Sequence, residues 1–248
     1  MLPYIVIFLF GITVGSFLNV CILRLPKKES IVAVPSHCVN CGKRLRPLEL
    51  VPLFSYLCLR GRCAGCKARI SAQYPIVEVA NGLLWCVLYW HFGASADLLF
   101  ACALCSALLV MAVVDGRTRV IPPGTTVFIL VLGALRLLLH LGDWPLYAIG
   151  FFAVSAFLLL VLLVTGGRGV GGGDVKLMAA CGLFLGWKLV LLAFFMGCVA
   201  GSVVHLSRMA FKKAGRVLAL GPYLAFGVLV SLLWGDAILR WYLGLLGL

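Results

Sequence analysis

Residues 169–177 read GVGGGDVKL and place one carboxylate, Asp174, in a glycine-rich break between two long apolar stretches. Ionisable side chains at or in a lipid bilayer are energetically costly, and they usually face a polar cavity or a partner. Glycines let two backbones approach closely, and irregular backbone at membrane depth is tolerated only where protein or water satisfies its polar groups. The segment therefore indicates a site within a helical membrane protein.

A second carboxylate, Asp115, follows the apolar run 108–114 and precedes the basic residues Arg117 and Arg119. Two acids at the ends of two membrane segments suggest a functional pair. The alternative is that both are solvated helix caps or residues at the lipid interface. The distribution of basic residues along the chain helps to decide between a functional pair and two unrelated surface residues, because it predicts on which side of the membrane each acid lies.

The composition predicts an all-α polytopic membrane protein. Of the 248 residues, 63% are hydrophobic and 12% are charged, whereas soluble domains are about half apolar and about a quarter charged. A membrane-spanning helix needs roughly 20 apolar residues. On this basis we expect about eight spans, at 4–23, 74–92, 97–114, 120–140, 144–165, 175–187, 189–207 and 217–235.

The net charge of +13 is concentrated in the loops on one side of these spans. Cytoplasmic loops of membrane proteins carry an excess of lysine and arginine, so this side is predicted to be cytoplasmic and both chain ends to lie outside. Asp115 and Asp174 then fall at the same, cytoplasmic face, which favours the functional pair. The charge is explained by topology and attraction to anionic lipids, and nucleic-acid binding is not expected. The basic residues are Arg24, Lys27, Lys28, Lys43, Arg44, Arg46, Arg60, Arg62, Lys67, Arg69, Arg117, Arg119, Arg168, Lys176, Arg208, Lys212, Lys213 and Arg216.

The longest polar loop, residues 24–73, contains two C-x-x-C pairs, Cys38 with Cys41 and Cys63 with Cys66. Four thiolates from two tight turns can surround a zinc ion, and so small a loop needs a staple in order to fold. Disulfides are the weaker interpretation because the loop is predicted to be cytoplasmic. His37 is a competing ligand, but four cysteines suffice; Gly42 and Gly65 suit the turns of the two pairs.

Several further motifs, taken in order, resemble those of the bacterial prepilin peptidases, the type IV leader peptidase family of G-x-G-D aspartic proteases. The similarity covers nearly the whole chain. It is carried by 15–20 (GSFLNV), 24–26 (RLP), the two C-x-x-C pairs, 73–78 (QYPIVE), Asp115, 171–177 (GGGDVKL) and 221–223 (GPY).

The resemblance implies a membrane aspartic endopeptidase that removes the short basic leader from type IV prepilins and pseudopilins at the cytoplasmic face of the bacterial inner membrane. Most members also methylate the new N-terminal residue with S-adenosylmethionine. Carried over to this sequence, the resemblance makes Asp115 and Asp174 the catalytic pair and the four cysteines the zinc ligands. Gly171, Gly173 and Lys176 would support the site loop. Glu49 and Glu78 are candidates for contact with substrate or for the methylation reaction, although Glu78 could instead belong to a structural ion pair. The residues that bind the cofactor are not assigned.

Two positions depart from the family pattern. The family usually has a Pro-Asp pair after the first catalytic aspartate, whereas this chain has Pro122-Pro123-Gly124. Methylating members commonly have an acid followed by Asn between the cysteine pairs, whereas Glu49 is followed here by Leu50. Methyl transfer is therefore a weaker expectation than proteolysis.

Three divisions of the chain follow: a first transmembrane helix at 1–23, a cytoplasmic zinc-binding loop domain at 24–73, and a transmembrane protease core at 74–248. One alternative is an ion-coupled transporter that uses the two aspartates as an ion relay and keeps a structural zinc loop. The sequence shows no internal repeat, and both acids lie at one face, which disfavours this alternative. A methyltransferase without protease activity would leave the paired aspartates unexplained.

Overall fold

The structure is a computed structural model, and it describes residues 1–210 and 219–245. Within these ranges the chain forms helices and no β-strand, with only two isolated β-bridges in the loop between the first two long helices. The predicted all-α class is confirmed. The basic residues Lys212, Lys213 and Arg216, used above for the topology, lie outside the described ranges.

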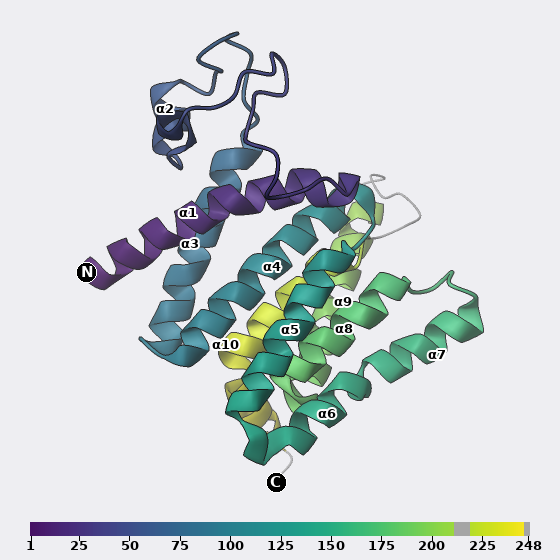
Figure 1. Cartoon of the computed structure of the whole chain (residues 1–248). Coiled ribbons are helices and arrows are strands. Elements are labelled where there is room, and N and C mark those ends of the chain that lie inside the picture. Colours follow the sequence, from purple (N-terminus) through teal and green to yellow (C-terminus); the bar gives the residue numbers. More distant parts are fainter. Residues whose placement is uncertain (211–218, 246–248) are drawn as a thin grey trace. The chain divides into compact units, whose positions relative to one another are not determined.

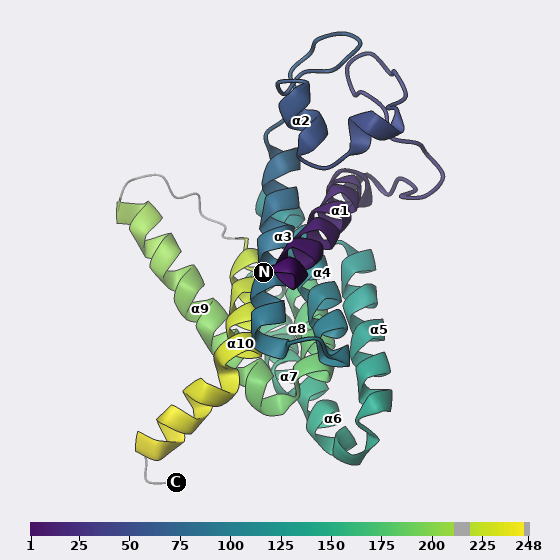
Figure 2. The ribbon, with the colours of Figure 1, turned by 90° about the vertical axis from the view of Figure 1, so that its left-hand side faces the viewer.

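The helices fall into two compact units, Met1–Cys102 and Ala103–Leu248, with the division inside α4. Figure 1 shows the elements in chain order, and Figure 2 shows them from a second direction. The first unit holds α1 (Leu2–Arg24), η1 (Leu25–Lys27), η2 (Pro47–Leu50), α2 (Phe54–Cys58), α3 (Gln73–Phe92) and the start of α4 (Ala96–Thr118). The second holds the rest of α4, then α5 (Pro123–Leu139), η3 (Leu141–Asp143), α6 (Trp144–Ala153), α7 (Ser155–Thr165), α8 (Gly172–Leu185), α9 (Trp187–Ala210) and α10 (Gly221–Leu245).

Five helical stretches in the described ranges are long and apolar enough to cross a membrane: Leu2–Lys27, Ala96–Thr118, Leu141–Thr165, Trp187–Ala210 and Gly221–Leu245. The other three predicted spans also coincide with helices, but the count of eight spans is not confirmed. Pro123–Leu139 is a shorter apolar helix, α8 has only 14 residues, and α3 is not among the five. Residues 217–218 of the last predicted span lie outside the described ranges.

In the first unit, α1 and α3 pack closely because glycines line their contact. A Cβ atom on Gly11 would lie 2.7 Å from the Cα atom of Gly82, and one on Gly15 would lie 2.8 Å from the Cα atom of Glu78. Small residues allow this approach between helices in membranes. Buried amides add hydrogen bonds between the two helices: Asn81 donates to the Gly11 carbonyl at 2.7 Å.

Arg24 fixes the path of the chain as it leaves α1. Its side chain is buried and donates to the backbone carbonyls of Ser30 at 3.1 Å and Val34 at 2.7 Å. A guanidinium group presents several donors in a rigid fork, so one arginine can order several carbonyls at once. The start of the cysteine-containing loop is thereby tied to the end of the first helix.

In the second unit, the short helix α8 is the central element, and it contacts α5, α6, α7, α9 and α10. Its residues from Leu177 to Gly182 are buried. Glycines again allow the closest approach, since a Cβ atom on Gly182 would overlap the Gly150 carbonyl of α6. On α5, Arg136 donates to the Phe184 carbonyl at 2.7 Å and so satisfies one backbone acceptor in the last turn of α8.

The close packing of α1 against α3 predicts that a larger residue at Gly15 lowers the stability of the protein. Gly15→Ala should lower the free energy of unfolding by about 1–3 kcal/mol, because the added methyl group meets the α3 backbone and forces the helices apart. Denaturant titration of the purified protein measures this change. Gly142→Ala is the control, since a Cβ atom there meets nothing within 4 Å; equal unfolding midpoints for the two variants would contradict the packing argument.

Candidate active site and metal centre

Asp115 lies near the end of α4, and its side chain is only 5% exposed. One carboxylate oxygen, Oδ2, accepts a hydrogen bond from the backbone N–H of Gly221 at 3.0 Å. Gly221 is the first residue of α10, and helix N-termini favour negative charge. A Cβ atom on Gly221 would come within 2.6 Å of the same oxygen, so glycine lets α10 approach the carboxylate this closely.

Asp174 lies in the first turn of α8 and is half-buried. Its Oδ2 atom accepts a hydrogen bond from the backbone N–H of Gly171 at 3.2 Å. A Cβ atom on Gly173 would lie 3.1 Å from the Cβ atom of Ile121, so this glycine admits the segment that follows α4. Lys176 is exposed and takes part in none of the ion pairs found in the described part of the chain.

The structure brings these two aspartates near each other. The Asp115 carboxylate is close enough that its negative charge acts on Asp174. Within residues 1–210 and 219–245, each carboxylate receives a single hydrogen bond, from a backbone N–H. Both oxygens concerned are Oδ2, so the other oxygen of each group has no protein donor in these ranges. Two neighbouring carboxylates held in this way can share a proton and a water molecule.

Gly221 contacts the candidate site residue Asp115 through a hydrogen bond that the sequence did not reveal. The GPY motif at 221–223 was visible, but nothing in it indicated a hydrogen bond to a carboxylate 106 residues earlier in the chain. The departure at Pro122-Pro123-Gly124 has a local explanation. These residues begin α5, with Pro122 as its N-cap and Pro123 as its first residue, a position where the missing N–H of proline costs nothing.

The four cysteines of the loop gather into one cluster. The sulfur atoms of Cys38, Cys41, Cys63 and Cys66 all lie within 4.8 Å of one another. The sulfur atoms of Cys38 and Cys66 are 3.9 Å apart. A tetrahedral zinc site with Zn–S bonds of about 2.3 Å requires sulfur separations of about 3.8 Å. The donor set and its spacing therefore fit a metal ion.

The two cysteine pairs form turns with the same hydrogen-bond pattern. Cys38 N–H donates to the Lys43 carbonyl and Gly42 N–H donates to the Cys38 carbonyl, both at 2.9 Å. In the second turn, Cys63 N–H donates to Ala68 at 2.9 Å and Lys67 N–H donates to Cys63 at 3.0 Å. We call these turns the first and second knuckles.

The equivalent position in the two knuckles has a positive φ, +70° at Gly42 and +60° at Lys67. Gly65 lies in the turn of the second knuckle, but the left-handed position of that knuckle is Lys67. Gly65 serves close packing, since a Cβ atom there would lie 3.1 Å from the Lys43 side chain. The competing ligand His37 lies outside the cluster and has a ring nitrogen 3.1 Å from the Pro35 carbonyl oxygen.

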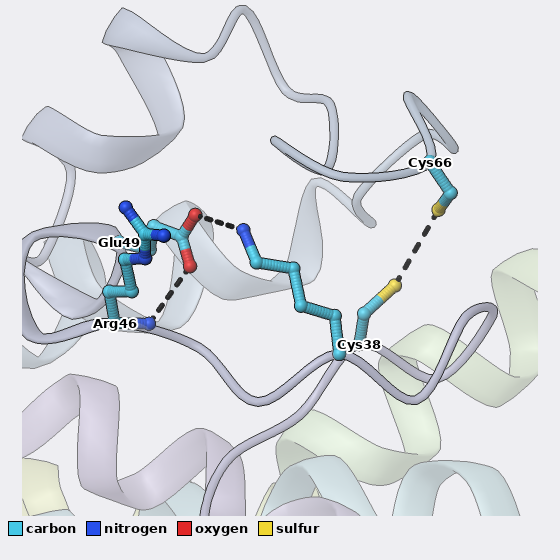
Figure 3. A network of polar contacts seen from close by, with 5 residues as sticks. Cys38, Arg46, Glu49 and Cys66 are labelled. Atoms are coloured by element: carbon cyan, nitrogen blue, oxygen red, sulfur yellow. Dashed lines mark hydrogen bonds and ion pairs between the residues drawn. The ribbon is translucent and has the colours of Figure 1, made fainter.

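Glu49 lies in η2, between the two knuckles, and both of its carboxylate oxygens are engaged (Figure 3). Oε1 forms an ion pair with Lys43 Nζ at 2.8 Å, and Oε2 accepts the backbone N–H of Arg46 at 2.9 Å. The hydrogen bond from Lys43, followed by that from Arg46, lowers the pKa of the Glu49 carboxyl below its ordinary value. Glu49 is therefore linked to the first knuckle through Lys43.

Glu78 lies in α3 with only 5% of its surface exposed. It accepts a hydrogen bond from the backbone N–H of Leu53 at 2.9 Å. Leu53 has φ +59° and ψ −52°, and Phe54 N–H donates to the Pro52 carbonyl at 2.6 Å. These values describe a γ-turn of the strained kind, which costs about 1–3 kcal/mol in a residue other than glycine.

Comparison with known proteins decides the family. Residues 9–92 match the model of the bacterial peptidase A24 N-terminal domain, and residues 102–206 match that of the type IV leader peptidase family. The chain is 35% identical to a protein of Pseudomonas putida, over 96% of this chain and 92% of that protein. The chain belongs to the type IV leader peptidase family.

Two other relatives have the same sequence identity to this chain. A Pseudomonas aeruginosa protein is 35% identical over 96% of this chain and 93% of its own length. A Bacillus subtilis protein is 35% identical over 96% of this chain and 97% of its own length. All three relatives are named prepilin leader peptidase/N-methyltransferase. No solved structure matches the chain. These comparisons give the transporter alternative no support.

The cysteine cluster predicts about one metal ion per chain. Replacing Cys38 and Cys63 together with serine should abolish metal binding, because each knuckle loses a thiolate. Elemental analysis of the purified protein measures the metal, and trypsin digestion should cut residues 35–70 faster in the variant. Replacing Cys102 and Cys105 of α4 with serine is the matched control and should keep the metal. Full metal occupancy in the first variant would exclude this cluster.

Proposed function

We propose that this protein is an aspartic endopeptidase of the bacterial inner membrane that removes the short basic leader from type IV prepilins and pseudopilins and then N-methylates the new N-terminus. The proximity of Asp115 and Asp174 is the observation that carries the proposal. The chain is 35% identical to prepilin leader peptidase/N-methyltransferases over more than 90% of their length. Asp115, Asp174 and the glycines around them are the proposed site residues.

The proposed cleavage needs no covalent intermediate. Two carboxylates close together cannot both ionise easily, so one keeps a proton while the other accepts a proton from a water molecule between them. The resulting hydroxide attacks the scissile carbonyl carbon. The protonated aspartate donates a hydrogen bond to the carbonyl oxygen and then helps to protonate the leaving amine. The backbone donors of Gly221 and Gly171 hold one oxygen of each carboxylate in place during these transfers.

The topology of the proposed enzyme follows from its charges. The basic residues between 24 and 69 favour a cytoplasmic location for the loop, which puts both chain ends outside and the aspartates at the cytoplasmic face. A prepilin leader would therefore meet the site from the cytoplasm. Anionic lipids are the expected neighbours of the basic loops, and nucleic acid is not an expected partner.

Cys38, Cys41, Cys63 and Cys66 would hold a structural zinc ion, which when bound closes the loop through four sulfur ligands. The methyl donor implied by the family is S-adenosylmethionine. A cavity of about 500 Å³ in the loop is lined by Arg44, Arg46 and apolar or small residues. Its lining contains no acid, so it does not suit a cofactor with a sulfonium and an ammonium group.

Replacing either catalytic aspartate should stop cleavage. Asp115→Asn and Asp174→Asn keep the shape of the side chain and remove the acid, so the rate of leader removal should fall about 100-fold or more. Incubation with a prepilin, followed by electrophoresis, measures the rate. Asp143→Asn is the matched control and should cleave at the wild-type rate. Processing by either active-site variant at a near-normal rate would show that the pair is not catalytic.

Methyl transfer should depend on the loop more than cleavage does. Glu49→Gln keeps one acceptor oxygen but loses the charge that pairs with Lys43. With a prepilin and S-adenosylmethionine, this variant should cut normally and methylate at least tenfold more slowly, as followed by product mass. Equal loss of both reactions would assign Glu49 to the stability of the whole loop. Wild-type protein that cuts without methylating would show that the change of the neighbouring amide to Leu50 has already removed the activity.

A further inference from the structure

The buried carboxylate of Glu78 has no part in the proposed cleavage, and it holds a segment that does not belong to its own helix. Residues 47–58 connect the two knuckles and contain η2 and α2; we call them the inter-knuckle segment. Glu78 accepts the backbone N–H of Leu53, in the middle of this segment, at 2.9 Å. The hydrogen bond joins the segment to α3.

The inter-knuckle segment is bent sharply where Glu78 holds it. Leu53 has φ +59° and ψ −52°, a conformation that residues other than glycine rarely adopt. A relaxed turn against an apolar side chain would avoid both the strain at Leu53 and the burial of a carboxylate. Strained backbone clusters at sites where function requires one conformation.

The same segment has little else to fix it. Several of its apolar side chains face outward: Leu48 is 83% exposed, Phe54 is 59% exposed and Leu57 is 69% exposed. Within the described part of the chain, its one ion pair joins Glu49 to Lys43, at the end near the first knuckle. Glu78 supplies a second point of attachment four residues further along the chain, at the bend itself.

We propose that Glu78 is a positioning residue for N-methylation, acting through the backbone of Leu53 to hold the inter-knuckle segment in the conformation that places Glu49. The inference rests on the proposed assignment of methyl transfer to the loop. Glu78 touches neither substrate nor cofactor in this role. Its function requires an acceptor oxygen at this position rather than a negative charge, which separates it from a catalytic acid.

Three variants of the full-length protein test the role. Glu78→Leu and Glu78→Ala remove the acceptor with a large and a small apolar side chain, and Glu78→Gln keeps one acceptor. Asn81→Leu is the matched control, because it removes a buried hydrogen bond of α3 that goes to the Gly11 carbonyl of α1 and not to the loop. Each protein is assayed for metal content, for prepilin cleavage, for methyl transfer and for hydrogen exchange in residues 47–58.

The proposal expects Glu78→Leu and Glu78→Ala to lose methyl transfer at least tenfold, with cleavage within threefold of wild type and metal retained. Hydrogen exchange in residues 47–58 should rise in both. Glu78→Gln should restore methyl transfer to within threefold of wild type. Asn81→Leu should leave the ratio of the two activities unchanged. Glu78→Ala decides the matter if Glu78→Leu does not insert in the membrane.

Other results overturn the proposal. The same selective loss in Asn81→Leu reduces Glu78 to a structural residue of the helix pair. A loss in Glu78→Gln as large as that in Glu78→Leu makes the charge, not the acceptor, the important property. Unchanged methyl transfer in the acceptor-free variants Glu78→Leu and Glu78→Ala removes the role altogether. Wild-type protein that cuts without methylating instead contradicts the proposed function, and this role with it, while the hydrogen-exchange comparison still decides whether Glu78 holds the segment.

Discussion

The need of each embedded carboxylate for a backbone donor is the constraint on which much of this structure depends. Four of the eight acids accept an N–H from the start of a helix. Asp115 bonds to Gly221 of α10 and Asp174 to the N-cap of α8, while Glu49 and Glu78 bond to the N-caps of η2 and α2. The first N–H groups of a helix have no partner inside the helix and carry partial positive charge. One hydrogen bond therefore gives an acceptor to an N–H group at the helix start and a donor to the carboxylate.

This pairing connects the local chemistry to the arrangement of the helices. An acid on one element fixes where another element begins, as the contact of Asp115 with Gly221 does for α4 and α10 in the second unit. Glycine recurs at these contacts because the donor backbone must come close to the carboxylate. The same small residue brings α1 to α3 and α6 to α8. Glycine therefore serves both the polar contacts and the apolar packing of the two units.

Much of the fold and of the site could be predicted from local patterns. The composition indicated a helical membrane protein, and the C-x-x-C spacing indicated the sulfur cluster, because both signals lie in short stretches of sequence. The number of spans was harder, since α8 and α3 are helices whose length or polarity does not by itself mark a membrane span. The donors of Gly221 and Leu53 could not be predicted, because each lies far along the chain from the acid it serves. Leu53 and Lys67 also adopt positive φ, which sequence reasoning reserves for glycine.

The length of α8 has a consequence for the supply of water. Its 14 residues extend about 21 Å at about 1.5 Å per residue, whereas the hydrocarbon core of a bilayer is about 30 Å thick. A helix this short cannot reach both surfaces, so at least one of its ends lies below the level of the lipid headgroups. Asp174 stands in the first turn of this helix, and a polar medium would have to extend inward to solvate it if that turn is the submerged end. The proposed hydrolysis consumes a water molecule, and this arrangement would bring that reactant into an otherwise apolar bundle.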